Sequence, residues 1–144
     1  MTMDIFNNVV SMDMSLNEDD KFSQIEAFHR QAILEYEQKL SHDPKSVGTL
    51  CDWIASYHEL ALVYKQKGAV QMAQKCLLIP HQSMLYMAKN NQGDVHREDI
   101  ATRAIGITLP PLLAFAKEHP PCDKCLKALK SQLAMIQQHK KTDH

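Results

Sequence analysis

The spacing of the apolar residues constrains the fold of this chain more than any other feature. The longest regular series lies in mid-chain: Leu50, Trp53, Ile54, Tyr57, Leu60, Ala61 and Tyr64. Steps of three and four positions place such side chains on one face of an α-helix. The helix is predicted to start within 46–49, where Thr49 and Asp52 fit a cap. Gly68 is predicted to end it, because helix ends commonly need a left-handed residue.

A similar series predicts a helix before this one. It starts near Ser15, which lies three residues before Glu18 as in a capping box, and it stops before Pro44. Its predicted apolar stripe consists of Phe22, Ile25, Phe28, Ala32, Tyr36 and Leu40.

Prolines divide the second half of the chain. Pro80 is expected either to kink the helix that begins near Ala69 or to open a new one, since proline lacks the N–H group and clashes with the preceding turn. The helical segment 95–119 is expected to break near 107–109, and a last helix to span 121–139. Because no strand pattern occurs, the sequence predicts an all-α fold of antiparallel helical hairpins.

The chain length of 144 residues fits one domain. Residues 17–141 are predicted to form this single helical domain, after an N-terminal segment of residues 1–16. That segment has Ile5, Phe6, Val9 and Val10 at helical spacing. It could dock on the body or on a partner, or be a frayed terminus. If it is not buried in its own chain, we expect it to form a homodimer.

The charge balance excludes some partners. A formal net charge of -1 gives no bulk attraction to nucleic acid or to an anionic membrane. We find neither a signal-peptide pattern nor an apolar run long enough to span a bilayer, so we expect a cytoplasmic protein. The four cysteines are expected to be reduced thiols.

Cys122 and Cys125 form a C-x-x-C pair, with His119 upstream. A structural zinc site needs four ligands, and the pair supplies two of them. A redox role is a second interpretation, since the start of a helix lowers the pKa of a thiol. The third is packing: both thiols would open an apolar helix face that contains Cys122, Cys125, Leu126, Leu129, Leu133 and Ile136.

The sequence contains no recognisable catalytic motif. It has no phosphate-binding glycine loop and no G-x-S-x-G element. Glu98 and Asp99 are adjacent and should point to different faces of a helix, so they make no acid–base pair. We therefore expect no catalytic residues, no resident metal and no cofactor.

The segment from Tyr57 to Leu77 resembles one tetratricopeptide repeat. The matching residues are Tyr57, Leu60, Ala61, Tyr64, Gly68, Ala73 and Leu77. Ala32, Tyr36 and Pro44 match the second half of a preceding repeat, so the resemblance covers about residues 32–80. It implies a TPR-like helical bundle in which small residues at 61 and 73 let two antiparallel helices approach closely.

In that family the first helix of each pair lines a groove that receives a peptide or a partner helix. The resemblance implies that His58, Leu62 and Lys65 face such a groove and bind a partner. Leu62 replaces an asparagine that grips a peptide carboxylate in several members, which favours an apolar or mixed ligand. Alternatively, His58 and Lys65 form a solvated helix face.

The sequence thus predicts a non-enzymatic protein–protein interaction module, a small adaptor or chaperone that binds a partner peptide or helix in a TPR-like groove. The alternative is a metal- or thiol-dependent regulatory protein that uses Cys122 and Cys125.

Overall fold

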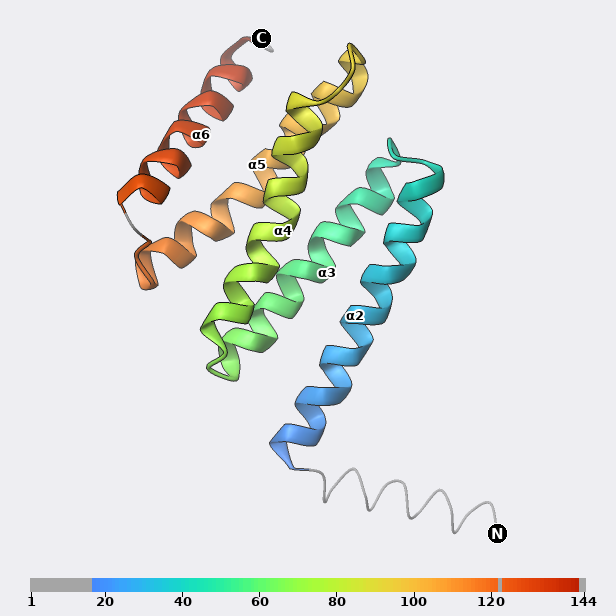
Figure 1. Cartoon of the computed structure of the whole chain (residues 1–144), viewed down its shortest axis with the longest axis vertical. Helices are drawn as coiled ribbons and strands as arrows, with labels where there is room; N and C mark the ends of the chain where they lie inside the picture. The colour runs from blue at the N-terminus through green and yellow to red at the C-terminus, as the bar shows by residue number, and fades with distance from the viewer. Residues whose placement is uncertain (1–16, 122, 143–144) are drawn as a thin grey trace.

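The computed structural model describes residues 17–121 and 123–142 (Figure 1). Within these residues the chain forms five helices and no strand: α2 (Glu18–His42), α3 (Val47–Gln66), α4 (Val70–Lys89), α5 (Val95–Glu118) and α6 (Asp123–Thr142). The helices lie side by side in chain order, and each packs against the next. The predicted all-α class is therefore confirmed, as a bundle of antiparallel neighbours.

The turn between α3 and α4 closes the central hairpin. Gly68 has a φ of 83°, the left-handed conformation predicted for it. Its N–H group donates to the carbonyl of Lys65 at 3.0 Å, and the N–H group of Ala69 donates to the carbonyl of Tyr64 at 2.8 Å. These two bonds form a Schellman motif, which satisfies the last carbonyls of α3. Gly68 thus lets the chain reverse within a few residues.

The helix starts differ slightly from the predicted caps. Ser46, not Thr49, caps α3: its side chain accepts from the Thr49 N–H group at 3.4 Å. Asn17 caps α2 in the same way through the N–H group of Asp20, whereas Ser15 lies outside the described residues. A capping side chain accepts from the amide two or three positions later, so the capping residue must precede the helix.

The break predicted near 107–109 is wrong, and Pro80 does not open a new helix. Pro80 lies inside α4, and Pro110 and Pro111 lie inside α5. Each proline removes one intrahelical hydrogen bond, which by itself would favour a kink. Burial around them offsets this loss, because Pro80 is buried in α4 and Thr108 and Leu109 are fully buried on α5. Packing between these two helices keeps both continuous.

The core lies between α3, α4 and α5. The stripe predicted for α3 is confirmed, except that Tyr57 is only half-buried. The stripe predicted for α2 is partly wrong, because Ile25 and Phe28 are exposed and the helix buries His29 and Ile33 instead. Among the described helices α2 packs only against α3, so it buries a narrow strip.

Helix α5 is long and apolar enough to cross a membrane by length and composition, with a mean hydropathy of 1.2 over its most apolar stretch. The sequence analysis had found no such run. Much of the helix is buried in the bundle: Ile100, Ala101, Ala104, Ile105, Thr108, Leu109, Leu112, Phe115 and Ala116. The core helix of a bundle meets the same two criteria, so α5 is weak evidence for a membrane span.

Candidate functional site

The three residues predicted to bind a partner, His58, Leu62 and Lys65, line one pocket of about 270 Å³. The pocket lies between α3, α4 and α5. Its other lining residues are Ala61, Ala73, Leu77, Pro111, Ala114 and Phe115. Helical spacing explains why the three come together, since residues three and four positions apart share a face.

Small side chains form the floor of this pocket. Ala61 on α3 and Ala73 on α4 are both buried and both line it. They lie on opposite sides of the Gly68 turn, so the hairpin brings them to the same place in the bundle. Larger side chains at these positions would fill the space. The pocket therefore depends on the two alanines that the sequence analysis singled out.

Leu62 is the most exposed large apolar side chain of the lining, with 58% of its surface accessible. On α5, Pro111 and Phe115 line the same pocket. Apart from His58 and Lys65, every lining residue is apolar. The pocket can hold an apolar side chain and remove Leu62 from water at the same time.

Two polar groups border the pocket. Lys65 Nζ forms an ion pair with Glu118 Oε2 at 2.7 Å, which joins α3 to α5. Hydrogen bonding from Lys65 lowers the pKa of Glu118, and both side chains are exposed to solvent. Such exposed pairs add little stability, so this one can exchange partners easily.

His58 supplies the pocket with an unsatisfied polar atom. Its Nε2 atom is buried and finds no hydrogen-bond partner among the residues that the structure describes. Burial also lowers the pKa of His58, which keeps the ring neutral near pH 7. Binding that turns the ring and gives Nε2 a hydrogen-bond partner would remove the cost of leaving that atom unpaired.

A second pocket, of about 290 Å³, lies between α4, α5 and α6. Its lining includes His81, which is fully buried. His81 Nδ1 lies 2.9 Å from Thr108 Oγ1, and His81 Nε2 lies 2.6 Å from Gln132 Oε1. The ring thus links three helices. No sequence pattern connects residues so far apart in the chain, so this cluster was missed.

The cysteine pair is only partly described, since Cys122 lies outside the described residues. Cys125 is exposed and lines the second pocket together with His119. The packing interpretation therefore fails for Cys125, although Leu129 and Leu133 do pack against the core. Within 17–121 and 123–142, no three histidine, cysteine, aspartate or glutamate residues are placed to hold a metal ion. Leu126 and Ile136 have no described side chain.

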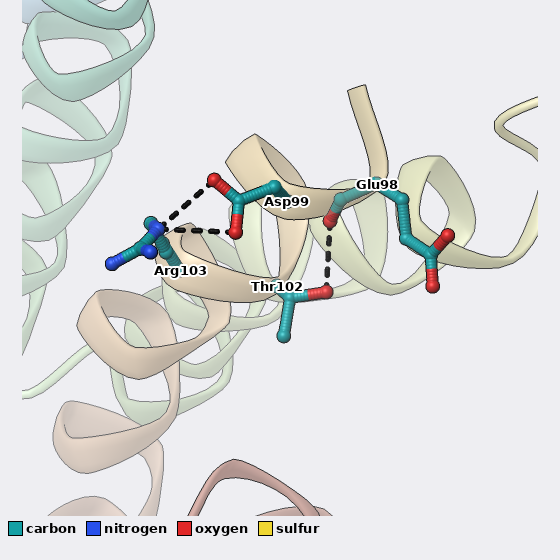
Figure 2. A network of polar contacts seen from close by, with 4 residues as sticks. All are labelled: Glu98, Asp99, Thr102 and Arg103. Atoms are coloured by element: carbon teal, nitrogen blue, oxygen red, sulfur yellow. Dashed lines mark hydrogen bonds and ion pairs between the residues drawn. The ribbon is translucent and has the colours of Figure 1, made fainter. Parts of the chain in front are cut away.

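The acidic pair on α5 behaves as the sequence predicted. Figure 2 shows the carboxylates of Glu98 and Asp99 pointing in different directions. Arg103 Nε donates to both oxygens of Asp99, at 3.1 and 3.0 Å. Thr102 Oγ1 donates to the backbone carbonyl of Glu98 at 2.8 Å. These contacts stay within one helix and form no acid–base pair.

Fold and pocket together define a small all-α bundle with an apolar pocket open between its central helices. The chain belongs to the family described as "Protein of unknown function (DUF2753)", whose model matches residues 13–143. No curated protein and no solved structure is significantly similar to it.

Proposed function

We propose that this chain is a non-enzymatic protein–protein interaction module, a small adaptor or chaperone that holds an apolar segment of a partner protein in the pocket between α3, α4 and α5. The observation on which this depends most is the exposed Leu62 in a pocket whose lining is apolar apart from His58 and Lys65. Exposed apolar surface around a concavity is typical of sites that bind a protein.

The size of the pocket supports a peptide side chain over a small-molecule substrate. Sites for small molecules and cofactors usually enclose about 300–1,000 Å³ and include several convergent polar groups. This pocket encloses about 270 Å³, and its polar lining consists of His58 and Lys65. A space of this size suits one or two apolar side chains of a longer segment that continues over the surface.

The resemblance to a tetratricopeptide repeat supports the same proposal. It places His58, Leu62 and Lys65 on the groove side of the first helix of a pair, and all three border the pocket. An apolar segment with a hydrogen-bonding group opposite His58 Nε2 and an acidic residue near Lys65 would complement this surface. In such a complex Lys65 would exchange Glu118 for the acidic residue of the partner.

Site-specific photo-crosslinking tests the proposal. Leu62→p-benzoylphenylalanine places a photoreactive group at the pocket, in cells that naturally produce the protein. Leu34→p-benzoylphenylalanine is the matched control, since Leu34 is 59% exposed and lines a different pocket, between α2, α3 and α4. We expect a defined apolar segment of one protein to be crosslinked at position 62 and not at 34.

The captured partner is then purified and its affinity measured. Leu62→Asp should weaken binding by about tenfold or more, which is about 1.4 kcal/mol, because it places a charge against an apolar contact. Leu34→Asp should leave the affinity unchanged. If position 62 captures no more protein than position 34, or if both substitutions have the same effect, the pocket is not the binding site.

A further inference from the structure

Large apolar side chains of helices α2, α3 and α5 remain exposed to solvent. This surface, called the apolar face below, consists of Ile25, Phe28, Leu62 and Ile107. Phe28 is 69% exposed, more than Leu62 itself. Ile107 lies four residues before Pro111, one helical turn along α5 from the pocket wall. The pocket is therefore one part of a wider apolar surface.

Contacts between α2 and α3 connect Phe28 with the part of α3 that carries Leu62. His29 Nδ1 of α2 lies 3.6 Å from Glu59 Oε2 of α3. Phe28 packs its ring against that of His29, with centroids 5.4 Å apart. Leu62 lies three residues after Glu59, on the same side of α3. Phe28 and Leu62 thus lie on either side of the His29–Glu59 contact.

The first described residues of the chain lie beside the end of α3. Asn17 caps the start of α2, and Asp19 in its first turn forms an ion pair with Lys67 at the end of α3. Lys67 Nζ also lies 5.3 Å from the ring centroid of Phe22. These contacts fix the start of α2 beside the end of α3. Leu62 and Lys65 lie within the last two turns of α3, so the start of α2 lies toward the end of α3 that carries the pocket.

The length and composition of residues 1–16 match the surface. Fully extended, they reach about 50 Å, whereas the 20 residues of α3 span about 30 Å. The segment contains apolar residues at helical spacing: Ile5, Phe6, Val9 and Val10. It has two aspartates, and it has no lysine or arginine that would repel Lys65. Its apolar residues can therefore reach the whole face, and its aspartates complement the charge of Lys65.

We propose that residues 1–16 of the same chain bind to the apolar face and occupy the pocket at Leu62. The tether gives the segment a high effective concentration at the face, on the order of millimolar for a short linker. The segment would then compete with a partner for the pocket and so regulate partner binding. This competition rests on the proposed function. Docking itself requires no partner.

Photo-crosslinking of the purified full chain tests the docking. Leu62→p-benzoylphenylalanine is irradiated and digested with trypsin, which releases residues 1–21 and 46–65 as separate peptides. We expect residues 1–21 to be joined to residues 46–65 within one chain. This product should be about tenfold more abundant than the crosslink of residues 1–21 to residues 31–39 in the matched Leu34 variant, as the effective concentration of a tethered segment predicts. Ile107→p-benzoylphenylalanine gives a second position on the face if the first variant is poorly folded.

Mixing isotopically labelled and unlabelled chains separates the possible occupants. Crosslinks within one isotopic form support the proposal. Crosslinks between the two forms would mean that a second copy covers the face, and they would overturn the proposal, as would the absence of any crosslink to residues 1–21 at both positions.

Competition is measured with the partner segment captured at position 62. The double substitution Phe6→Asp and Val9→Asp should strengthen its binding by about tenfold, because it releases the pocket. Equal binding to both chains, together with no internal crosslink, would refute docking and leave the proposed function intact. If Leu62→Asp does not change partner binding, the proposed function is refuted. The internal crosslink would still show whether residues 1–16 dock on the face.

Discussion

Acid should destabilise this protein through His81, the buried histidine that joins α4, α5 and α6. Burial lowers the pKa of His81 below its ordinary value of 6.5, although the hydrogen bond with Gln132 opposes the shift. The unfolded chain therefore binds a proton at a higher pH than the folded chain does. The contribution of His81 to stability is complete above pH 6.5 and is lost as the pH falls toward its lower folded pKa.

The hydrogen bonds of His81 survive protonation, so the destabilisation arises from burying the charge. In the neutral ring, Nε2–H donates to Gln132 Oε1 and the Thr108 hydroxyl donates to Nδ1. In the charged ring, Nδ1–H donates to Thr108 Oγ1, and the hydroxyl can turn to the Ile105 carbonyl, 3.4 Å away. Because His81 binds one proton, it can change the free energy of unfolding by at most about 1.4 kcal/mol per pH unit.

Urea unfolding followed by tryptophan fluorescence measures this effect. Trp53 is the single tryptophan and is buried in α3, so it reports on the bundle. Between pH 7 and 5, His81→Gln should make the free energy of unfolding less dependent on pH by up to about 1.4 kcal/mol per unit. His96→Gln, which removes an exposed histidine, should leave the slope unchanged. A slope that His81→Gln does not reduce would refute the assignment.

Three further predictions concern the Gly68 turn, the reactivity of Cys76 and the metal content of the protein. Gly68→Ala should lower the free energy of unfolding by about 1 kcal/mol, because φ is 83° at this position. Gly48→Ala, in a regular helix, should be neutral or stabilising. Neither new methyl group meets a neighbour, so equal effects of the two substitutions would refute the backbone argument. Burial raises the pKa of Cys76 to about 11. Near pH 8, iodoacetamide should therefore alkylate Cys76 about 100-fold more slowly than the exposed Cys51. Comparable alkylation rates, measured by mass spectrometry, would contradict this. If the protein has no resident metal, protein purified without a histidine tag should contain less than about 0.1 equivalent of zinc or iron. A full equivalent of metal that is lost in the Cys122→Ser variant would instead favour the metal-dependent alternative.

The sequence predicted the helices well because their apolar period is local information. The α3 stripe and the Gly68 turn could be derived from a few neighbouring residues, and both are confirmed. The continuity of α4 and α5 could not, since it depends on contacts with other helices. Pro80 and Pro111 disfavour a straight helix locally, and packing across the bundle outweighs that preference.

The α2 stripe failed for a related reason. Periodicity identifies a helix, but the face that it buries depends on how many neighbours it has. Ile25 and Phe28 fit an apolar stripe in the sequence, yet α2 contacts one helix only and leaves them exposed. For the candidate site, the resemblance to a tetratricopeptide repeat grouped His58, Leu62 and Lys65, whereas no pattern linked the α5 residues Pro111 and Phe115 to them.

The row of helices, in which each one packs mainly on its chain neighbours, has a consequence for how the molecule comes apart. Helix α4 is held by α3 and α5, whereas α2 is held by α3 alone, and the contact of α6 with α5 is the least extensive between consecutive helices. Stability in such a linear stack is a sum of nearest-neighbour terms, so local opening starts at its ends. Amide hydrogen exchange should therefore be fastest in α6 and in the first turns of α2, and slowest where α4 and α5 meet.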